Sequence, residues 1–293
     1  MNKRLEQYLR CPLCLSDLKN RNNTLVCSKN KHNFKIVQGI PILLDYSSLH
    51  THSQNQQTHF EKTFGKRTID SVINMKPHEI RYLERFAGNF KDIKDKRVIE
   101  VGIGSGYMSI GLAKRGAKVL ACDITLTNLI TLKRFTKVLG LEKSILFVCC
   151  SADQLPCKNN AFDYFVINAV LEHIPQEKKA ISEIKRTVKK GGGLMITVPV
   201  KYKYIFPLLL PVNYLHDKRI GHLRRYDDIS LRSKFHGFSM KRVYFTGHPL
   251  KVIKFIINLI VKIFDERGME IEDERWENVK MWSSNVIALF YKK

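Results

Sequence analysis

The chain has 293 residues, 44% hydrophobic and 26% charged, and its 50 Lys and Arg against 27 Asp and Glu give a formal net charge of +23. This composition is ordinary for a globular protein, and the length allows one large domain and a small one. The N-terminus lacks the apolar segment of a secretory signal, and no run reaches the ~18 apolar residues of a membrane-spanning helix. Seven cysteines favour a reducing compartment over a disulfide scaffold. We therefore expect a cytoplasmic protein, either free or associated with the surface of a membrane.

Residues 1–46 predict a separate metal-binding module. Cys11 and Cys14 form a Cys-x2-Cys pair, Cys27 follows after twelve residues, and four residues separate it from His32. Three thiolates and one imidazole suit a closed tetrahedral zinc site, which has no open position for a catalytic water. Because so small a module buries little core, we expect the zinc to be structural. A redox pair and unliganded thiols are the alternatives, but no thioredoxin-like βαβ pattern surrounds these cysteines.

Residues 47–96 are expected to form a linker and cap helices. The segment 47–59 is polar and low in apolar residues, which is typical of a linker. The segment 60–90 indicates two short helices that lead into the next strand and close over a ligand.

Residues 97–125 predict a strand, a glycine turn, a helix and a second strand. In chain order these are a β-rich run at 97–101, the glycines Gly102, Gly104 and Gly106, a helical pattern at 107–115, and a buried run at 117–122 that delivers Asp123. This arrangement builds a nucleoside pocket at the edge of a parallel sheet, where a carboxylate accepts hydrogen bonds from ribose hydroxyls. Glycines let the backbone turn tightly against the ligand.

Four segments indicate which nucleoside-containing ligand this pocket binds. The pattern E-x-G-x-G-x-G from Glu100 to Gly106 departs from the G-x-G-x-x-G of dinucleotide folds and resembles the first motif of class I S-adenosylmethionine-dependent methyltransferases. The segments 151–163, 168–174 and 189–199 resemble further motifs of that family, in the same order. The resemblance implies a methyltransferase domain at 97–293 with a Rossmann-like α/β fold and a mostly parallel seven-stranded sheet. A Rossmann-like domain that binds another nucleotide is the alternative.

The resemblance also implies roles for single residues in holding S-adenosylmethionine. Glu100 orients the methionine end, the three glycines allow close approach, and Asp123 takes the ribose hydroxyls. Asp153 takes the adenine amine, and Asn168 belongs to the segment that faces the methyl donor.

Three residues are candidates for a general base: Glu172, His173 and His222. Some quinone-type O-methyltransferases carry a metal-binding E-x-x-E-H motif, whose last two residues match Glu172 and His173. Ala169 stands where this motif has its first acid, so we expect no catalytic Mg²⁺. The segment from His222 to Tyr226 resembles the H-x-x-R-Y segment of small-molecule and lipid methyltransferases. The structural alternatives are that His173 packs under the cofactor and that His222 orients the start of a helix.

The C-terminal part predicts a helix at 226–236, a strand at 238–245 and a last strand at 284–291, with an insertion at 247–282 between the two strands. The polar residues of the insertion's core fall on one narrow stripe of a helix expected at 251–265: Lys251, Lys254, Asn258, Lys262 and Asp265. Such a helix either lies at a membrane interface or forms a buried lid. Residues 201–264 carry 13 basic and 3 acidic residues, whereas 265–277 carry 7 acidic and 2 basic ones.

Two acceptor classes remain open. A small or lipid-linked acceptor is favoured by the segments around His173 and His222 and by the apolar insertion. Methylation of rRNA or tRNA bases is the alternative, since the positive charge suits a polyphosphate and the zinc module is similar to that of bacterial rRNA guanine-N1 methyltransferases. A non-catalytic role in binding another protein is a third possibility, against which the intact cofactor motifs argue.

Overall fold

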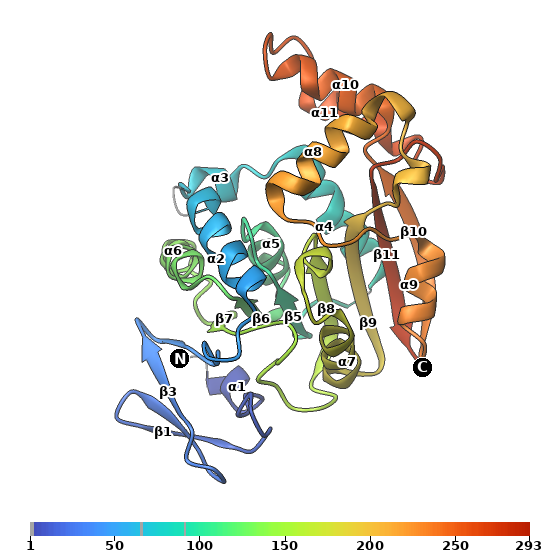
Figure 1. Cartoon of the computed structure of the whole chain (residues 1–293). Helices are drawn as coiled ribbons and strands as arrows, with labels where there is room; N and C mark the ends of the chain where they lie inside the picture. The colour runs from blue at the N-terminus through green and yellow to red at the C-terminus, as the bar shows by residue number, and fades with distance from the viewer. Residues whose placement is uncertain (1–2, 65–66, 91) are drawn as a thin grey trace.

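The computed structural model describes residues 3–64, 67–90 and 92–293, and a seven-stranded sheet forms its centre (Figure 1). The strand order is β10-β11-β9-β8-β5-β6-β7. The bounds are β5 Arg97–Val101, β6 Lys118–Asp123, β7 Ile145–Cys149, β8 Phe162–Asn168, β9 Val188–Pro199, β10 Phe238–Thr246 and β11 Asn285–Lys292. Strands β5 to β9 pair in parallel, whereas β11 runs antiparallel to both β9 and β10. The predicted Rossmann-like, mostly parallel sheet is confirmed.

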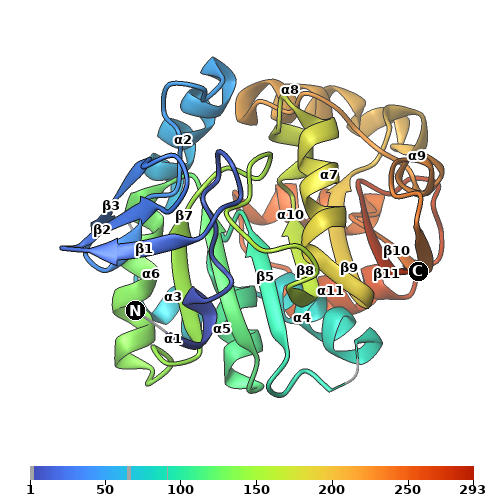
Figure 2. The same cartoon turned by 90° about the horizontal axis from the view of Figure 1, so that it is seen from below.

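Helices cover both faces of this sheet (Figure 2). Their bounds are α4 Pro77–Asn89, α5 Tyr107–Lys114, α6 Leu126–Val138, α7 Glu177–Thr187 and α9 Asp228–Lys234. Side chains alternate along each strand, so neighbouring residues join different cores. Ile99 packs in the core with α7 and α9, and Val98 packs in the core with α4, α5 and α6. Packing on both faces of the sheet fixes the carboxyl ends of the strands, and the loops that line the site begin at these ends.

The family resemblance of 189–199 also predicts a glycine turn at 189–193 and a strand at 194–199, but both stretches belong to the single strand β9. Phe162 lies opposite Val188, but Tyr164 lies opposite Gly193, so the register shifts and residues 189–192 bulge within β9. A bulge absorbs extra residues without ending the strand. The helix predicted at 226–236 is shorter, since Asp227 caps it by accepting a hydrogen bond from the backbone N–H of Ser230.

The polar segment 47–59 is mostly helical rather than a linker. Residues Thr51–Phe64 form α2, followed by α3 (Asp70–Ile73). The side chains that look solvated in the sequence are bound to distant backbone: Gln56 Nε2 donates to the Ile220 carbonyl at 3.0 Å, and Gln57 Nε2 to the Ile124 carbonyl at 2.8 Å. These long-range contacts stabilise a helix that composition alone does not predict.

A small N-terminal unit lies beside the β7 edge of the large sheet (Figure 1). It contains α1 (Lys3–Glu6) and an antiparallel sheet of β1 (Leu18–Arg21), β2 (Thr24–Cys27), β3 (Asn33–Val37) and β4 (Ile40–Pro41). The backbone N–H of Leu43 donates to the Cys149 carbonyl at 2.8 Å, and that of Arg10 to the Pro156 carbonyl at 2.8 Å. The unit therefore covers part of an otherwise open strand edge.

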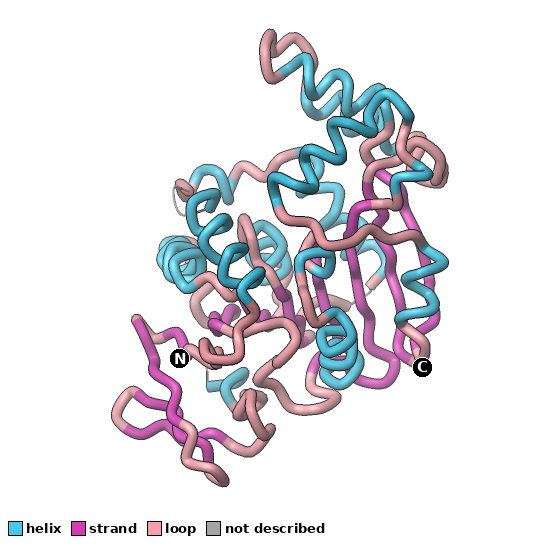
Figure 3. The backbone as a smooth tube through the Cα atoms, in the orientation of Figure 1, coloured by secondary structure: helices cyan, strands magenta, loops and turns pink. Residues whose placement is uncertain are grey.

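The insertion forms two helices, α10 (Pro249–Asn258) and α11 (Glu266–Glu274), at the end of the molecule that projects farthest in Figure 1. The predicted helix at 251–265 thus ends early. Asn258 ends it by donating to the Phe264 carbonyl at 2.6 Å and accepting from the Phe264 N–H at 2.9 Å. The residues between α10 and α11 form the loop at the top of Figure 3. Within the described ranges, no helix is both long and apolar enough to cross a bilayer.

The polar stripe of α10 faces α11 rather than solvent. Lys251 Nζ lies 2.6 Å from Glu270 and 3.3 Å from Asp273, and Lys254 Nζ lies 2.6 Å from Glu272. Acidic residues of α11 therefore neutralise Lys251 and Lys254, and α10 exposes the apolar side chains of Leu250, Ile253 and Phe255.

Candidate active site

A cavity of about 750 Å³ opens at the carboxyl ends of β5, β6 and β8. Eight of the ten residues predicted for the cofactor and for catalysis line it: Glu100, Gly102, Gly104, Asp123, Asn168, Glu172, His173 and His222. Gly106 and Asp153 are not among its lining residues, although Ser151 and Ala152 are. The Asp153 carboxylate accepts a hydrogen bond from the Ser151 hydroxyl. Because Asp153 does not line the cavity, its recognition of adenine stays a prediction.

The glycine loop after β5 uses its glycines for two different reasons. A Cβ on Gly102 would lie 2.2 Å from the Val170 side chain, so this glycine is required by packing inside the protein. Gly104 has a φ of +44° but its nearest neighbour, Phe64, would be 3.6 Å from an added Cβ. Gly104 is therefore the glycine that leaves backbone open to the cavity.

Two buried carboxylates stand at the ends of β5 and β6. Asp123 accepts hydrogen bonds from the backbone N–H groups of Ile103 at 3.0 Å and Thr125 at 2.8 Å, which fix its orientation. Burial raises its pKa above the ordinary value. Glu100 accepts a hydrogen bond from the Ser109 hydroxyl, and burial raises its pKa to about 8. A cationic ligand beside Glu100 would favour its ionised form and so gain binding energy.

Two amide side chains present unused polar atoms. Asn168 Nδ2 donates to the Tyr107 hydroxyl at 2.5 Å, while its Oδ1 has no partner within the described chain. Asn128, at the start of α6, is buried and neither of its amide atoms has a partner among the described residues. Buried polar atoms are almost always paired, so these two amides indicate a polar ligand. No motif in the sequence singles out Asn128.

Helix α2 covers the cavity with aromatic side chains that sequence reasoning missed. The rings of Phe60 and Phe64 stack with centroids 5.7 Å apart, and the Arg67 guanidinium lies 4.0 Å from the Phe64 ring. The edge of Phe60 also meets the His173 ring at 5.4 Å. The sequence predicts that the segment 60–90 closes over a ligand, and Phe60 and Phe64 belong to it, but no motif singles out these two side chains.

The three candidate bases meet at one end of the cavity. Glu172 and His173 lie in the short 3-10 helix η1 (Leu171–His173), and His222 follows α8 (Leu210–Ile220). The His173 and His222 rings lie 4.8 Å apart, and His222 Nε2 lies 3.6 Å from Glu172 Oε1. Burial raises the pKa of Glu172 to about 8 and lowers that of His173 to about 3, the latter with help from His222. At neutral pH both are therefore uncharged.

One atom from each of these three residues lies within 4.8 Å of the others, a separation at which they could also hold a cation. The sequence predicts no catalytic Mg²⁺ here, and that expectation stays untested.

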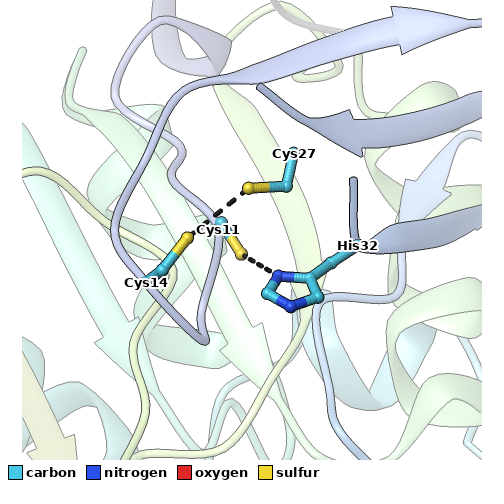
Figure 4. Close-up of side chains that lie close together, drawn as sticks. All are labelled: Cys11, Cys14, Cys27 and His32. Carbon is cyan, nitrogen blue, oxygen red and sulfur yellow. Dashed lines mark hydrogen bonds between the residues drawn. The ribbon is translucent and has the colours of Figure 1, made fainter. Parts of the chain in front are cut away.

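A second cluster occupies the N-terminal unit (Figure 4). Cys14 Sγ lies 3.4 Å from Cys27 Sγ, and Cys11 Sγ lies 3.4 Å from His32 Nδ1; all four ligand atoms lie within 4.8 Å of one another. Tetrahedral zinc, with bonds of ~2.3 Å to sulfur and ~2.0 Å to nitrogen, separates its ligand atoms by about 3.5 to 3.8 Å. The donor set and spacing fit zinc, and this geometry supports His32 as the fourth ligand.

Comparison with known proteins places the site in context. Residues 99–196 match the family described as "Methyltransferase domain". The demethylmenaquinone methyltransferase of Paenarthrobacter aurescens is 30% identical over 129 residues, which cover 44% of this chain and 48% of that protein. The ubiquinone biosynthesis O-methyltransferase of Coxiella burnetii is 29% identical over 133 residues, covering 45% and 53%. The chain thus spans about half the length of the curated relatives it matches.

Among solved structures, the geranyl diphosphate C-methyltransferase of Streptomyces coelicolor has a TM-score of 0.62 at 10% identity, over 83% of this chain and 98% of that one. At this identity the likeness concerns the fold alone.

Proposed function

We propose that this chain, which carries an S-adenosylmethionine-dependent methyltransferase domain at residues 99–196, methylates a small or lipid-linked acceptor. The observation that carries the proposal is the convergence of Glu100, Gly104 and Asp123 on one cavity at the carboxyl edge of the sheet. Methyl transfer from a sulfonium needs nucleophile, carbon and sulfur in line, and such positioning is worth roughly 7–11 kcal/mol at best. A preformed cavity with fixed carboxylates suits that task.

In this proposal each end of the cofactor meets a different group. Asp123 binds the ribose hydroxyls, since its two backbone hydrogen bonds hold its carboxylate in place. Glu100 attracts the cationic methionine end, which would lower its raised pKa. The side-chain amide of Asn128 and the Oδ1 atom of Asn168, which have no partner among the described residues, supply further polar contacts.

The acceptor end of the cavity favours an apolar molecule. Phe60, Ile174 and Ile220 line it beside His173 and His222. The names of two relatives, a demethylmenaquinone and a ubiquinone-biosynthesis methyltransferase, describe quinone-type acceptors and support this class.

A lipid-linked acceptor would also account for the outer surface of the insertion. No residue of α10 is buried, and the following loop exposes Leu259 to 70%, Ile260 to 84% and Ile263 to 67%. Exposed apolar segments of this kind mark interaction sites. The lysine-containing loop, at the projecting end of the molecule, would insert its apolar side chains into the interface of an anionic bilayer. Peripheral membrane association thus follows from the same proposal.

Labelled S-adenosylmethionine tests the activity directly. The protein is incubated with a total lipid extract or with total RNA, and the label in each fraction is counted. Transfer into the lipid fraction is expected, and transfer into RNA alone would contradict the acceptor class. Co-sedimentation with anionic vesicles tests the surface: binding is expected to fall at least tenfold in Ile260→Asp, whereas Val138→Asp, which changes an exposed apolar residue of α6, serves as the control.

RNA is the second candidate because of one surface. Residues 18–41 carry five basic side chains and no acidic one, and all five are exposed: Lys19, Arg21, Lys29, Lys31 and Lys35. If RNA is the substrate, affinity should fall steeply with salt as counterions are released.

We also propose residues 1–46 as a zinc module in which Cys11, Cys14, Cys27 and His32 hold the ion. The ion would stabilise the fold of the unit and take no part in methyl transfer.

A further inference from the structure

Among the described residues, His222 is the one candidate base whose ring is hydrogen-bonded to a carboxylate, that of Asp217, which does not line the cavity. Its Nδ1 lies 2.7 Å from Asp217 Oδ1, and its backbone N–H donates to the Asp217 carbonyl at 3.0 Å. An ionised carboxylate only accepts hydrogen bonds, so the proton of the neutral ring belongs on Nδ1. The lone pair is then on Nε2, the atom on the Glu172 side.

Asp217 is itself held as a carboxylate. Arg225 approaches it with Nε at 2.5 Å and Nη2 at 2.6 Å, a two-pronged contact, and the Tyr202 hydroxyl donates to it at 2.5 Å. Burial acts to raise the pKa of Asp217, but Arg225 and Tyr202 outweigh it and leave that pKa below the ordinary value. The direction of the bond to His222 is therefore fixed at neutral pH.

The groups around His222 leave its Nε2 as the available proton acceptor. Glu172, 3.6 Å away, is protonated at neutral pH for the reason given above. His173 Nδ1 lies 3.3 Å from the Gly221 carbonyl, so its ring is oriented by a neutral acceptor that cannot stabilise an added positive charge as a carboxylate does. The remaining neighbour, His216, is 5.9 Å away between ring centroids.

We propose that Asp217 is a positioning residue that holds His222 in its Nδ1–H form, and that His222 Nε2 removes the proton of an acidic hydroxyl on the acceptor during methyl transfer. This deepens the proposed function and rests on it. The O–H bond breaks towards Nε2 while the methyl carbon passes from sulfur to oxygen. The products are the methyl ether, neutral S-adenosylhomocysteine and the imidazolium, so one positive charge moves from sulfur to His222. Imidazole is a weak base, which matches a hydroxyl with the acidity of a phenol rather than that of an alkyl alcohol.

The imidazolium formed in this step lies next to the Asp217 carboxylate, which stabilises it. An Asp217→Asn protein loses that stabilisation, and its amide can also present an N–H to the ring. We therefore expect the His222 pKa to fall and the ring to shift towards the Nε2–H form, in which Nε2 no longer accepts a proton.

Nitrogen NMR of histidine-labelled protein with bound S-adenosylhomocysteine tests the positioning role without an acceptor. The expected result is an Nδ1–H ring for His222 in the wild type at pH 7.5 and loss of that form in Asp217→Asn. Tyr202→Phe, which removes a different hydrogen bond to the same carboxylate, is expected to keep the Nδ1–H form and controls for general disturbance of the loop. An Nε2–H ring in the wild type, or an unchanged ring in Asp217→Asn, would overturn the assignment.

The catalytic role is tested with a matched pair of probes, 3,4-dihydroxybenzoate and 3,4-diaminobenzoate, and labelled S-adenosylmethionine. Label is expected on the dihydroxy compound, reduced about 10²-fold or more in His222→Asn and Asp217→Asn, with S-adenosylhomocysteine affinity unchanged. The acidic limb of kcat/KM should move to lower pH in Asp217→Asn, a shift that a merely structural role would not produce. Label only on the diamino compound, equal rates in all variants, or no label on either probe would refute the base. Failure of the wild type to bind S-adenosylhomocysteine would instead refute the proposed function itself.

Discussion

Replacing Asp123 by asparagine tests the cofactor assignment most directly. The side chain keeps its shape, but one carboxylate oxygen becomes an NH₂ group that faces either the Ile103 or the Thr125 N–H. Hydrogen bonds to charged groups contribute about 1.5–3 kcal/mol each, and the ribose supplies two hydroxyls. Because one oxygen survives, we expect a net loss of about 3 kcal/mol, or a roughly 10²-fold weaker Kd for S-adenosylhomocysteine.

Isothermal titration calorimetry measures this loss, and a second variant separates binding from folding. The unpaired N–H left by the substitution should cost about 1–3 kcal/mol of stability. Asp163→Asn serves as the control, because Asp163 also accepts a backbone N–H, that of Arg97 at 2.8 Å, but lies outside the cavity lining. We expect similar destabilisation in both variants and weaker binding in Asp123→Asn alone. A folded Asp123→Asn protein with wild-type affinity would refute the ribose role.

The pH dependence of wild-type binding provides a further check. Burial raises the folded-state pKa of Asp123, so in the free protein this carboxylate takes up a proton at a higher pH than an exposed aspartate does. The protonated group is a poorer acceptor for ribose hydroxyls, so affinity should fall as pH decreases through the raised pKa. Asp123→Asn should lack this dependence.

Three other predictions concern the zinc module, the insertion and the glycine loop. Elemental analysis should find one zinc per chain, absent in Cys27→Ser but retained in Cys157→Ser, a buried cysteine outside the cluster; equal zinc in both would contradict the site. Asp273→Asn should lose about 3–5 kcal/mol in urea unfolding, since Asp273 is a fully buried partner of a guanidinium and a lysine, whereas Glu272→Gln on the surface should lose under about 1 kcal/mol. The depressed pKa of Asp273 means that its contribution is complete above about pH 4, the ordinary aspartate value, and is lost as pH falls towards the folded value; a difference between wild type and variant that grew on acidification would contradict this sign. Gly104→Ala should weaken S-adenosylhomocysteine binding at least tenfold while costing only about 1–2 kcal/mol of stability for its positive φ; unchanged affinity would show that the cofactor does not approach this backbone.

The convergence of the residues proposed to hold the cofactor was predictable because they are close together in the sequence. A strand, a glycine turn, a helix and a second strand span fewer than thirty residues, and strands of a parallel sheet end at one edge, so Glu100, Gly104 and Asp123 had to converge. The last strand was predictable for a similar reason, because its continuous apolar run from Val286 to Phe290 is typical of a strand that is buried on both faces.

The acceptor half depends on contacts between distant segments. Helix α2 is held over the cavity by Gln56, which binds a carbonyl 164 residues away, and no local pattern reports such a bond. Glu172 and His222 lie fifty residues apart in the chain, and only the packing of η1 against the end of α8 brings them within 3.6 Å. Asp217 looks like an ordinary helix residue in the sequence, and only its position against the ring of His222 gives it a role. The sequence by itself therefore determined the fold and the edge of the sheet at which we propose that the methyl donor binds, because backbone conformation and strand order are encoded locally. The tertiary structure decided which segments cover the cavity and which groups line its proposed acceptor end, because those contacts exist only once remote segments have packed together.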